Sequence, residues 1–347
     1  MASLLSDFDY TLPPELIALY PPKDRVSARL MVVDRETGKH QQRRFSEILD
    51  FLNPGDLLVL NNSRVIPARI FTSRKTGGKV ELFLLREREP QVWTALVRPN
   101  RKVKKGDFLN LGDPKDKVTV EALDDSVPKS GERLLRFHGK PMKDILNQYG
   151  HIPLPPYIAR QDDSLDRELY QTVYAKEEGS VAAPTAGLHF NEKLLADLRK
   201  KGVEIAEVTL HVGYGTFQSI GVEDLSQHQM HEEMYEVTEQ TAGQINRACQ
   251  EGRRIIACGT TALRVLESAA DLRGRVTPGR ASTRLFIYDP YKFKAAQGMI
   301  TNFHLPKSTL LCLADAFLGG RRLLDLYQKA IDEHYHFYSY GDAMLIL

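Results

Sequence analysis

The second half of the chain alternates short apolar runs with helical patterns that have clear end signals. Residues 203–212 and 254–258 have the apolar and β-branched composition of buried strands. Asn191 and Thr238 stand at the N-cap positions of two helical patterns, and a glycine follows each pattern. Strands and helices in alternation are typical of a mostly parallel sheet with helices on both faces. We therefore predict an α/β fold, an α/β/α sandwich, for most of the chain.

The alternation continues toward the C-terminus. We expect a strand at residues 284–287, a polar strand end at 301–303, and apolar helices at 308–318 and 321–331. Ser308 follows a proline and is a good N-cap for the first of these helices. A strand end that delivers polar side chains beside a helix N-terminus is where α/β proteins place binding sites.

A different pattern occupies the region after residue 70. Short β-type runs follow one another without helices between them, separated by turns rich in Gly, Pro and charge, at residues 80–85, 92–97, 118–123 and 133–137. Such spacing predicts a small barrel or sandwich. We expect a small β-barrel domain at residues 71–145, inserted into an α/β domain made of residues 1–70 and 146–347.

Charge and cysteine usage limit the class of protein. The 347 residues carry a formal net charge of only +2, so a contact with nucleic acid must come from a local patch. The largest basic cluster lies on a turn of the predicted barrel, at Arg98, Arg101, Lys102, Lys104 and Lys105. A solvated surface is the more common explanation of such a cluster, and a polyanionic partner is compatible with it.

Three cysteines, Cys249, Cys258 and Cys312, lack C-x-x-C spacing. This pattern argues against a disulfide framework or a thiolate metal site and fits a reducing compartment. The N-terminus has no secretory pattern, and no apolar run approaches the length of a membrane span. We expect a cytoplasmic protein that does not enter a membrane.

Five polar segments lie at predicted strand ends or helix starts. They contain Thr301, Asn302, Phe303 and His304; Thr185, Gly187 and His189; His211, Gly213, Gly215, Thr216 and Phe217; His231 and Glu233; and Gly259, Thr260, Thr261, Arg264 and Glu267. Open α/β sheets gather ligands at the carboxyl ends of their strands. Imidazoles titrate near neutral pH, and four of these residues are histidines. Together the segments predict a polar catalytic cleft.

Each segment also has an ordinary structural explanation. Arg264 and Glu267 could form a surface pair three residues apart, and Gly213 with Gly215 could form a simple turn. The glycines are not a dinucleotide fingerprint, since Gln218 stands where a third glycine is required. His228 and His231 have no H-E-x-x-H pattern around them, so we predict no metal site.

The combined segments resemble one family, the S-adenosylmethionine:tRNA ribosyltransferase-isomerases of queuosine biosynthesis. The matching stretches run in the family's order from residue 8 to the C-terminal G-D-A-M-L-I-L: F-D-Y-T-L-P-P-E-L-I-A, N-N-S-R-V-I-P-A-R, V-W-T-A-L-V-R-P, A-P-T-A-G-L-H-F, H-V-G-Y-G-T-F, M-H-E-E, G-T-T-A-L-R-V-L-E and T-N-F-H-L-P-K-S-T-L. The chain departs from the pattern at Asp289-Pro290-Tyr291, where the family usually has Pro-Gly-Tyr, and at Gln297, where an Asp is common.

The resemblance implies an α/β domain with an inserted barrel and a specific reaction. The ribosyl part of S-adenosylmethionine is transferred to 7-aminomethyl-7-deazaguanine at the wobble position of a tRNA with a GUN anticodon, and is isomerised there. The product is epoxyqueuosine in tRNA, and adenine and methionine are released. S-adenosylmethionine is thus a consumed substrate, no true cofactor is implied, and we expect the protein to act as a monomer.

The site residues follow from this reaction as a hypothesis. His189, His211, His231, His304 and Glu233 are expected to supply the acid, base and carboxylate groups. The substrate would be held by Thr185, Gly187, Gly213, Gly215, Thr216, Phe217, Gly259, Thr260, Thr261, Arg264, Glu267, Thr301, Asn302 and Phe303. A sulfonium favours carboxylates and aromatic faces around it.

Two other classes of protein remain open at this point. A methyltransferase that uses the same donor would need a glycine-rich loop after an early strand, and residues 57–64 contain none. A non-catalytic tRNA-binding module would explain the basic cluster but not the polar strand ends.

Overall fold

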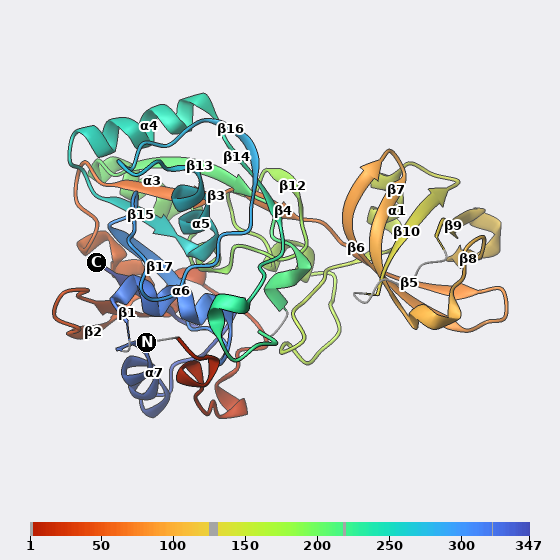
Figure 1. The fold of residues 1–347 in the computed structure, drawn as a ribbon, viewed down its shortest axis with the longest axis horizontal. Helices are drawn as coiled ribbons and strands as arrows, with labels where there is room; N and C mark the ends of the chain where they lie inside the picture. The colour runs from red at the N-terminus through yellow and green to blue at the C-terminus, as the bar shows by residue number, and fades with distance from the viewer. Residues whose placement is uncertain (1–2, 125–130, 218–219, 321) are drawn as a thin grey trace.

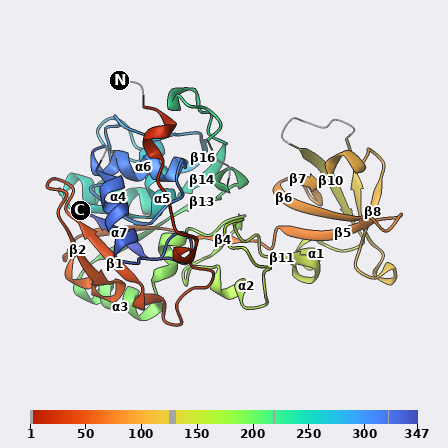
Figure 2. The ribbon, with the colours of Figure 1, turned by 90° about the horizontal axis from the view of Figure 1, so that it is seen from below.

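The computed structural model describes residues 3–124, 131–217, 220–320 and 322–347, and it describes only the backbone at Pro114, Thr216 and Phe217. The chain forms a large lobe built around one sheet and a smaller lobe beside it (Figure 1). Both chain ends lie on the large lobe, as a second view also shows (Figure 2). Among the described residues, no helix has both the length and the apolar composition that crossing a membrane requires.

The large lobe contains a nine-stranded sheet. Its strands, in spatial order, are β16 (Gly279–Thr283), β14 (Glu233–Val237), β13 (Glu204–Leu210), β3 (Leu57–Asn61), β15 (Ile255–Cys258), β17 (Gly298–Asn302), β18 (Ala343–Ile346), β1 (Arg29–Val33) and β2 (His40–Arg44). The central strands β13, β3, β15 and β17 run parallel to one another. These central strands match the apolar runs that the sequence predicts.

The prediction of a mostly parallel sheet is wrong, because the sheet is mixed. Strands β14, β16, β18 and β2 each pair antiparallel with a neighbour. No α-helix stands between β13 and β14 in the described chain, so the strand returns directly beside its neighbour. Two helices in succession separate β17 from β18, and the second helix brings the chain back to the end of the sheet from which it left.

Helices cover both faces of the sheet, as expected for an α/β/α sandwich. Helices α4 (Glu239–Gln250), α5 (Gly259–Ala269), α6 (Thr309–Leu318) and α7 (Leu323–Asp332) pack on the face that carries Leu57 and Val59. Helix α3 (Glu192–Lys201) packs on the opposite face, against Leu58 and Leu60. The alternation of these four strand residues between two buried layers explains the continuous apolar run.

The predicted helix ends are confirmed where a cap specifies them. The Asn191 side-chain oxygen accepts a hydrogen bond from the Leu194 amide at 2.8 Å, and Gly202 ends α3 with a φ of 94°. Ser308 likewise caps α6. The strand predicted at residues 284–287 is wrong: this segment is irregular, and the strand β16 ends just before it at Thr283.

The smaller lobe is a closed antiparallel β-barrel, as predicted. Its strands are β5 (Arg69–Arg74), β6 (Lys79–Glu89), β7 (Val92–Arg98), β10 (Glu132–His138), β9 (Val118–Ala122) and β8 (Phe108–Leu111), and β8 pairs back to β5. Helix α1 (Met142–Tyr149) follows, and β11 (Gly150–His151) adds to β5. The exact domain boundaries at residues 71 and 145 stay a prediction.

Short elements connect the two lobes. Strand β4 (Ser63–Val65) pairs with β12 (Glu177–Ser180), and α2 (Asp166–Leu169) lies between β11 and β12 along the chain. Tyr214, in the large lobe, also contacts the barrel. The Arg98 guanidinium at the end of β7 donates a hydrogen bond to the Tyr214 hydroxyl at 3.1 Å. The Tyr214 ring also contacts the Phe83 ring of the barrel, with centroids 5.0 Å apart.

Candidate active site

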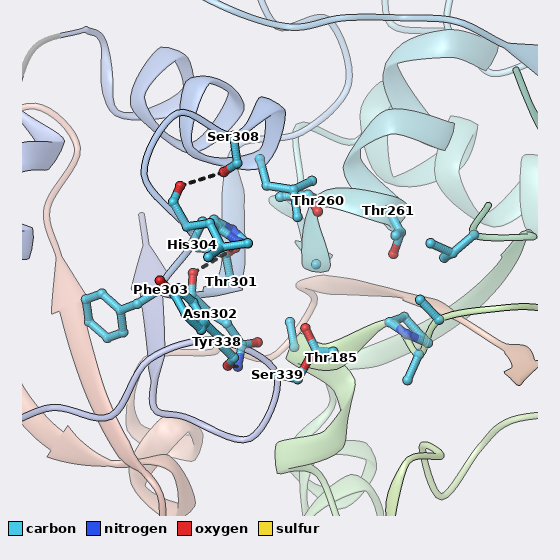
Figure 3. A pocket seen from close by; sticks show the side chains of 18 of the residues that line it. Thr185, Thr260, Thr261, Thr301, Asn302, Phe303, His304, Ser308, Tyr338 and Ser339 are labelled. Atoms are coloured by element: carbon cyan, nitrogen blue, oxygen red, sulfur yellow. Dashed lines mark hydrogen bonds between the residues drawn. The ribbon is translucent and has the colours of Figure 1, made fainter. Parts of the chain in front are cut away.

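A pocket that is partly open to solvent lies at the carboxyl ends of β15 and β17 (Figure 3). Many of the predicted site residues line it: Thr185, Glu233, Gly259, Thr260, Thr261, Arg264, Thr301, Asn302, Phe303 and His304. They come from separate segments of the chain. The expectation that polar strand ends meet at one edge of the sheet therefore agrees with the geometry for these residues.

Other predicted residues do not line this pocket. They are His189, His211, His231, Gly187, Gly213, Gly215 and Glu267. The side chains of Thr216 and Phe217 lie outside the described residues.

One wall of the pocket is the first turn of α5. Gly259 has a φ of 90°, a backbone conformation that glycine adopts freely, and it turns the chain from β15 into the helix. Thr260 and Thr261 follow and face the pocket. The amides of a first helical turn have no intrahelical acceptor. The Thr261 hydroxyl is buried and has no hydrogen-bond partner within the described part of the chain.

The second wall carries a buried ion pair between Arg264 on α5 and Glu233 on β14. Both side chains are about 95% buried, with relative exposures of 5%. The Arg264 Nη1 group donates to Glu233 Oε2, and the Gly213 amide donates to Glu233 Oε1 at 2.9 Å. The Arg264 Nε group donates to the Leu285 carbonyl at 3.2 Å. Its Nη2 group is buried without a partner among the described residues.

The third wall is the end of β17. The Asn302 Nδ2 group donates to the Tyr338 carbonyl at 2.9 Å and lies 3.3 Å from His189 Nε2. A carbonyl can only accept, so this contact fixes which side-chain atom of Asn302 is the nitrogen. The Asn302 Oδ1 atom is left buried without a partner in the described structure. His189 thus stands behind Asn302 and positions it.

His304 is the one predicted catalytic histidine that lines the pocket. Its Nε2 atom lies 2.7 Å from the Thr301 hydroxyl, and its amide donates to the Tyr327 hydroxyl at 2.9 Å. Burial lowers the pKa of His304 to about 3. Burial also lowers the pKa of His189 to about 4, although the nearby Asp342 charge acts in the opposite direction. Both imidazoles are therefore neutral at neutral pH.

The remaining two histidines lie outside the pocket. Burial lowers the pKa of His211, whose ring packs so closely on Gly179 that a β-carbon there would lie 2.8 Å from Nδ1. His231 is exposed, and its ring covers Gly215, where a β-carbon would lie 2.5 Å from the ring. Both glycines therefore permit close packing.

Glu267 holds a loop together. Its buried carboxylate accepts hydrogen bonds from the backbone amides of Lys294 at 2.9 Å and Ala295 at 3.0 Å, and from the Tyr291 hydroxyl at 3.3 Å. This loop contains the departures from the family pattern at residues 289–297. Gln297 within it accepts a hydrogen bond from the Ile255 amide at 2.9 Å, and so anchors the loop to β15.

Gly187 also has a packing role. A β-carbon there would lie 1.9 Å from the Tyr174 hydroxyl, so the close approach of this ring requires glycine.

Several residues that line the pocket are not among the site residues predicted from the sequence. They are mainly aromatic or small: Tyr157, Tyr170, Ala182, Val212, Ser308, Tyr338 and Ser339. Tyr157 ends the proline-rich stretch at residues 152–157, and Tyr338 lies in an aromatic stretch shortly before the C-terminus. Aromatic residues in such positions are typical of a core, so no local signal separates them from packing residues. No group of three or more His, Cys, Asp or Glu side chains in the described residues is arranged to hold a metal ion.

The two neutral imidazoles predict acid sensitivity. The unfolded chain binds a proton at each near the ordinary histidine pKa of 6.5, whereas the folded chain binds it only near 4 or 3. Their contribution to stability is complete above pH 6.5 and is lost as the pH falls. Each histidine should lower the free energy of unfolding by about 1.4 kcal/mol per pH unit in this range. Urea unfolding of the wild type, His189→Gln and His304→Gln between pH 7 and pH 5 measures this. An equal slope in all three proteins would contradict the prediction.

Comparison with known proteins identifies the family. The family model described as "Queuosine biosynthesis protein" matches residues 5–346. Two similar relatives are each named S-adenosylmethionine:tRNA ribosyltransferase-isomerase. The protein from Desulforamulus reducens is 47% identical, covering 99% of both chains, and the one from Clostridioides difficile is 48% identical, covering 98% of both.

A solved structure is also similar. The crystal structure of S-adenosylmethionine tRNA ribosyltransferase from Thermotoga maritima has 38% sequence identity and a TM-score of 0.56, and the match covers 98% of this chain and 100% of that one. The resemblance inferred from the sequence motifs is confirmed. Both the motifs and the fold thus lead to one conclusion: this chain belongs to the queuosine biosynthesis protein family, with the S-adenosylmethionine:tRNA ribosyltransferase-isomerases.

Proposed function

We propose that this protein transfers the ribosyl moiety of S-adenosylmethionine to 7-aminomethyl-7-deazaguanine at the wobble position of tRNA and isomerises it. The product is epoxyqueuosine in tRNA, with release of adenine and methionine. The observation that carries the proposal is the 47% identity, over 99% of both chains, to a protein named for this reaction. The pocket supports it, because its polar groups converge on one partly open pocket at the strand ends.

The charges of the pocket suit a sulfonium substrate. A sulfonium is attracted to carboxylates and to aromatic faces. Glu233 lines the pocket and supplies the carboxylate. The Phe303 ring, in contrast, is fully buried in the core against Tyr327 and Phe337. Glu233 is paired with Arg264, so the two side chains together carry no net charge. The pair therefore does not repel a bound cation.

His304 is the proposed general base. The sulfonium acidifies the neighbouring 5′ C–H bonds, and a neutral imidazole can accept the proton that starts the rearrangement. The low pKa of His304 makes its neutral imidazole a weak base and its imidazolium a strong acid once it has formed. The same proton can then pass to a ring nitrogen of adenine, which leaves more readily when protonated. Methionine departs as a neutral thioether.

The tRNA is proposed to lie along the side of the molecule where the two lobes meet. Glu233 in the pocket contacts Gly213, and the next residue, Tyr214, contacts Arg98 at the end of β7. The exposed basic turn of the barrel begins just after Arg98 in the chain. A continuous path of neighbours therefore runs from the pocket to this turn, which is suited to phosphate contacts.

Neutralising the basic turn should flatten the salt dependence of tRNA binding. Exchanging Arg101, Lys102 and Lys105 for glutamine removes up to three phosphate contacts. The slope of log K against log salt should fall by about 0.7 to 0.9 per lost contact. Lys329→Gln on α7 removes an exposed charge from the large lobe and serves as the control. An unchanged slope in the triple variant would remove the turn from the interface.

The proposal also covers the tRNA anticodon, the cellular compartment, the oligomeric state and the domain boundaries. The tRNA carries a GUN anticodon, the protein acts in the cytoplasm as a monomer, and the barrel domain spans residues 71–145. These points rest on the family likeness and on the sequence pattern of the two lobes.

Product analysis tests the proposed function directly. The protein is incubated with S-adenosylmethionine and tRNA that carries the deazaguanine precursor, and the small molecules are identified by mass spectrometry. Adenine and methionine in equal amounts, together with modified tRNA, are expected. S-adenosylhomocysteine would indicate a methyltransferase, and no turnover would indicate a binding module; either result would refute the proposal.

A further inference from the structure

The pocket walls contain three polar groups that no described residue satisfies: Asn302 Oδ1, Thr261 Oγ1 and Arg264 Nη2. A buried polar group without a partner is energetically unfavourable. Buried polar groups in folded proteins are usually hydrogen-bonded, so three such groups around one pocket indicate that a ligand or water satisfies them there. Asn302 and Thr261 lie on opposite sides of the pocket (Figure 3). The groups also differ in chemistry, so they give the pocket two unlike ends.

The Asn302 end is an acceptor beside aromatic rings. The side-chain nitrogen of Asn302 is already used by Tyr338 and His189, so only the oxygen is left for a ligand. This oxygen accepts only from an N–H or O–H group. The rings of Tyr157 and Tyr338 lie with centroids 4.6 Å apart and both line the pocket. A flat heterocycle with an exocyclic amine matches this combination.

The backbone of this end is held in place. Tyr338 has a φ of 72°, an uncommon conformation for a residue with a β-carbon. Its carbonyl accepts from Asn302 at 2.9 Å, its amide donates to the Phe303 carbonyl at 3.0 Å, and the adjacent Ser339 hydroxyl lies 2.7 Å from the Tyr157 hydroxyl. These contacts offset the cost of this backbone conformation. Such conformations are concentrated at ligand sites.

The α5 end is a donor site for an anion. Arg264 Nη2 and the Thr261 hydroxyl are both unsatisfied, and the first-turn amides of α5 lie beside them. Arg264 is 95% buried, so its free donor is not a surface group. The neighbouring Glu233 carboxylate provides a place for a cation next to that anion. An α-amino acid group, with one carboxylate and one ammonium, has this pair of charges.

We infer that S-adenosylmethionine binds this pocket in one orientation, with the adenine amine on Asn302 and the base beside the Tyr157 and Tyr338 rings, and the methionine carboxylate on Thr261 and Arg264. This orientation rests on the proposed function for the identity of the ligand. The ribose and sulfonium then span the middle of the pocket, where Thr185 and Thr260 lie, with His304 on the Asn302 side.

The adenine half of the inference is tested by exchanging the base. S-adenosylhomocysteine and S-inosylhomocysteine differ only in whether position 6 carries an amine or an oxo group. Calorimetry on the unmodified protein should show at least about tenfold tighter binding of the adenosyl probe, because the oxo group places one acceptor against another. Asn302→Leu should reduce this preference to less than about twofold. No preference in the wild type, or no binding of either probe, overturns the inference.

The carboxylate half is tested with a truncated probe. 5′-Methylthioadenosine keeps the base and lacks the amino-acid group. Thr261→Val, which keeps the shape of the side chain, should weaken S-adenosylhomocysteine about three- to tenfold and leave methylthioadenosine unchanged. Asn302→Leu should weaken both probes. If instead Thr261→Val weakened both probes and Asn302→Leu weakened only S-adenosylhomocysteine, the ligand would bind in the opposite orientation. These binding results are independent of turnover, so adenine release without a base preference would refute the orientation alone.

Discussion

His304→Gln is expected to slow single-turnover adenine release about 10²- to 10⁴-fold, the usual effect of removing a general base. Glutamine can still reach the Thr301 hydroxyl, so the wall of the pocket is retained while the group that accepts the proton is lost. Rapid-quench measurements with saturating S-adenosylmethionine and precursor tRNA separate this chemical step from product release. Binding of S-adenosylhomocysteine should change by less than about threefold.

Other histidines provide the comparison. His334→Gln changes an exposed side chain on the large lobe and should retain the wild-type rate. His211 and His231 carry the same predicted role from the sequence, yet both lie outside the pocket lining. If His211→Gln or His231→Gln lost as much rate as His304→Gln, the assignment of His304 as the general base would be wrong.

Glu233→Gln is expected to destabilise the fold by about 3–5 kcal/mol, because it leaves the buried Arg264 charge without its partner. The variant Glu233→Gln with Arg264→Met removes both charges and should recover much of this loss. Urea unfolding at pH 7 of both single variants and the double variant gives the coupling free energy. Additive effects would mean that the pair contributes nothing beyond its separate groups.

An exposed ion pair on the same strand sets the scale. Glu236 on β14 pairs with Arg280 at 2.8 Å, but the Arg280 side chain is 78% exposed. Glu236→Gln should therefore cost less than about 1 kcal/mol. A similar cost for Glu233→Gln would show that burial does not strengthen the inner pair.

Local signals account for what the sequence predicts well. Asn191, Ser308 and Gly202 mark helix ends because each acts on backbone groups within a few residues. The apolar runs at Leu57–Asn61 and Ile255–Cys258 have to be central strands because both faces of the sheet are covered. β18 runs antiparallel to β17 because α6 and α7 bring the chain back to the same end of the sheet. No local sequence pattern predicts this strand direction.

Some residues of the candidate site can likewise be predicted from local signals, and others cannot. Thr260, Thr301 and Asn302 lie at or just after strand ends, so the topology of the sheet places them at the pocket. Glu267 has the same apparent signal, since it lies one turn after Arg264, yet it faces the loop at residues 291–296. Tyr157 and Tyr338 reach the pocket through long-range packing with each other. Their roles depend on tertiary contacts that only the folded chain defines.

The attachment of the barrel affects how the large lobe folds. The chain enters the barrel through Arg69 and Ile70 and leaves through Gly150 and His151, and these residues pair with each other. Once the barrel has formed, its two ends are as close as the ends of a hairpin turn. The long insertion then adds almost no loop-closure entropy to the pairing of β3 with β13. A barrel that folds first therefore lowers the effective contact order of the central sheet and should speed its assembly.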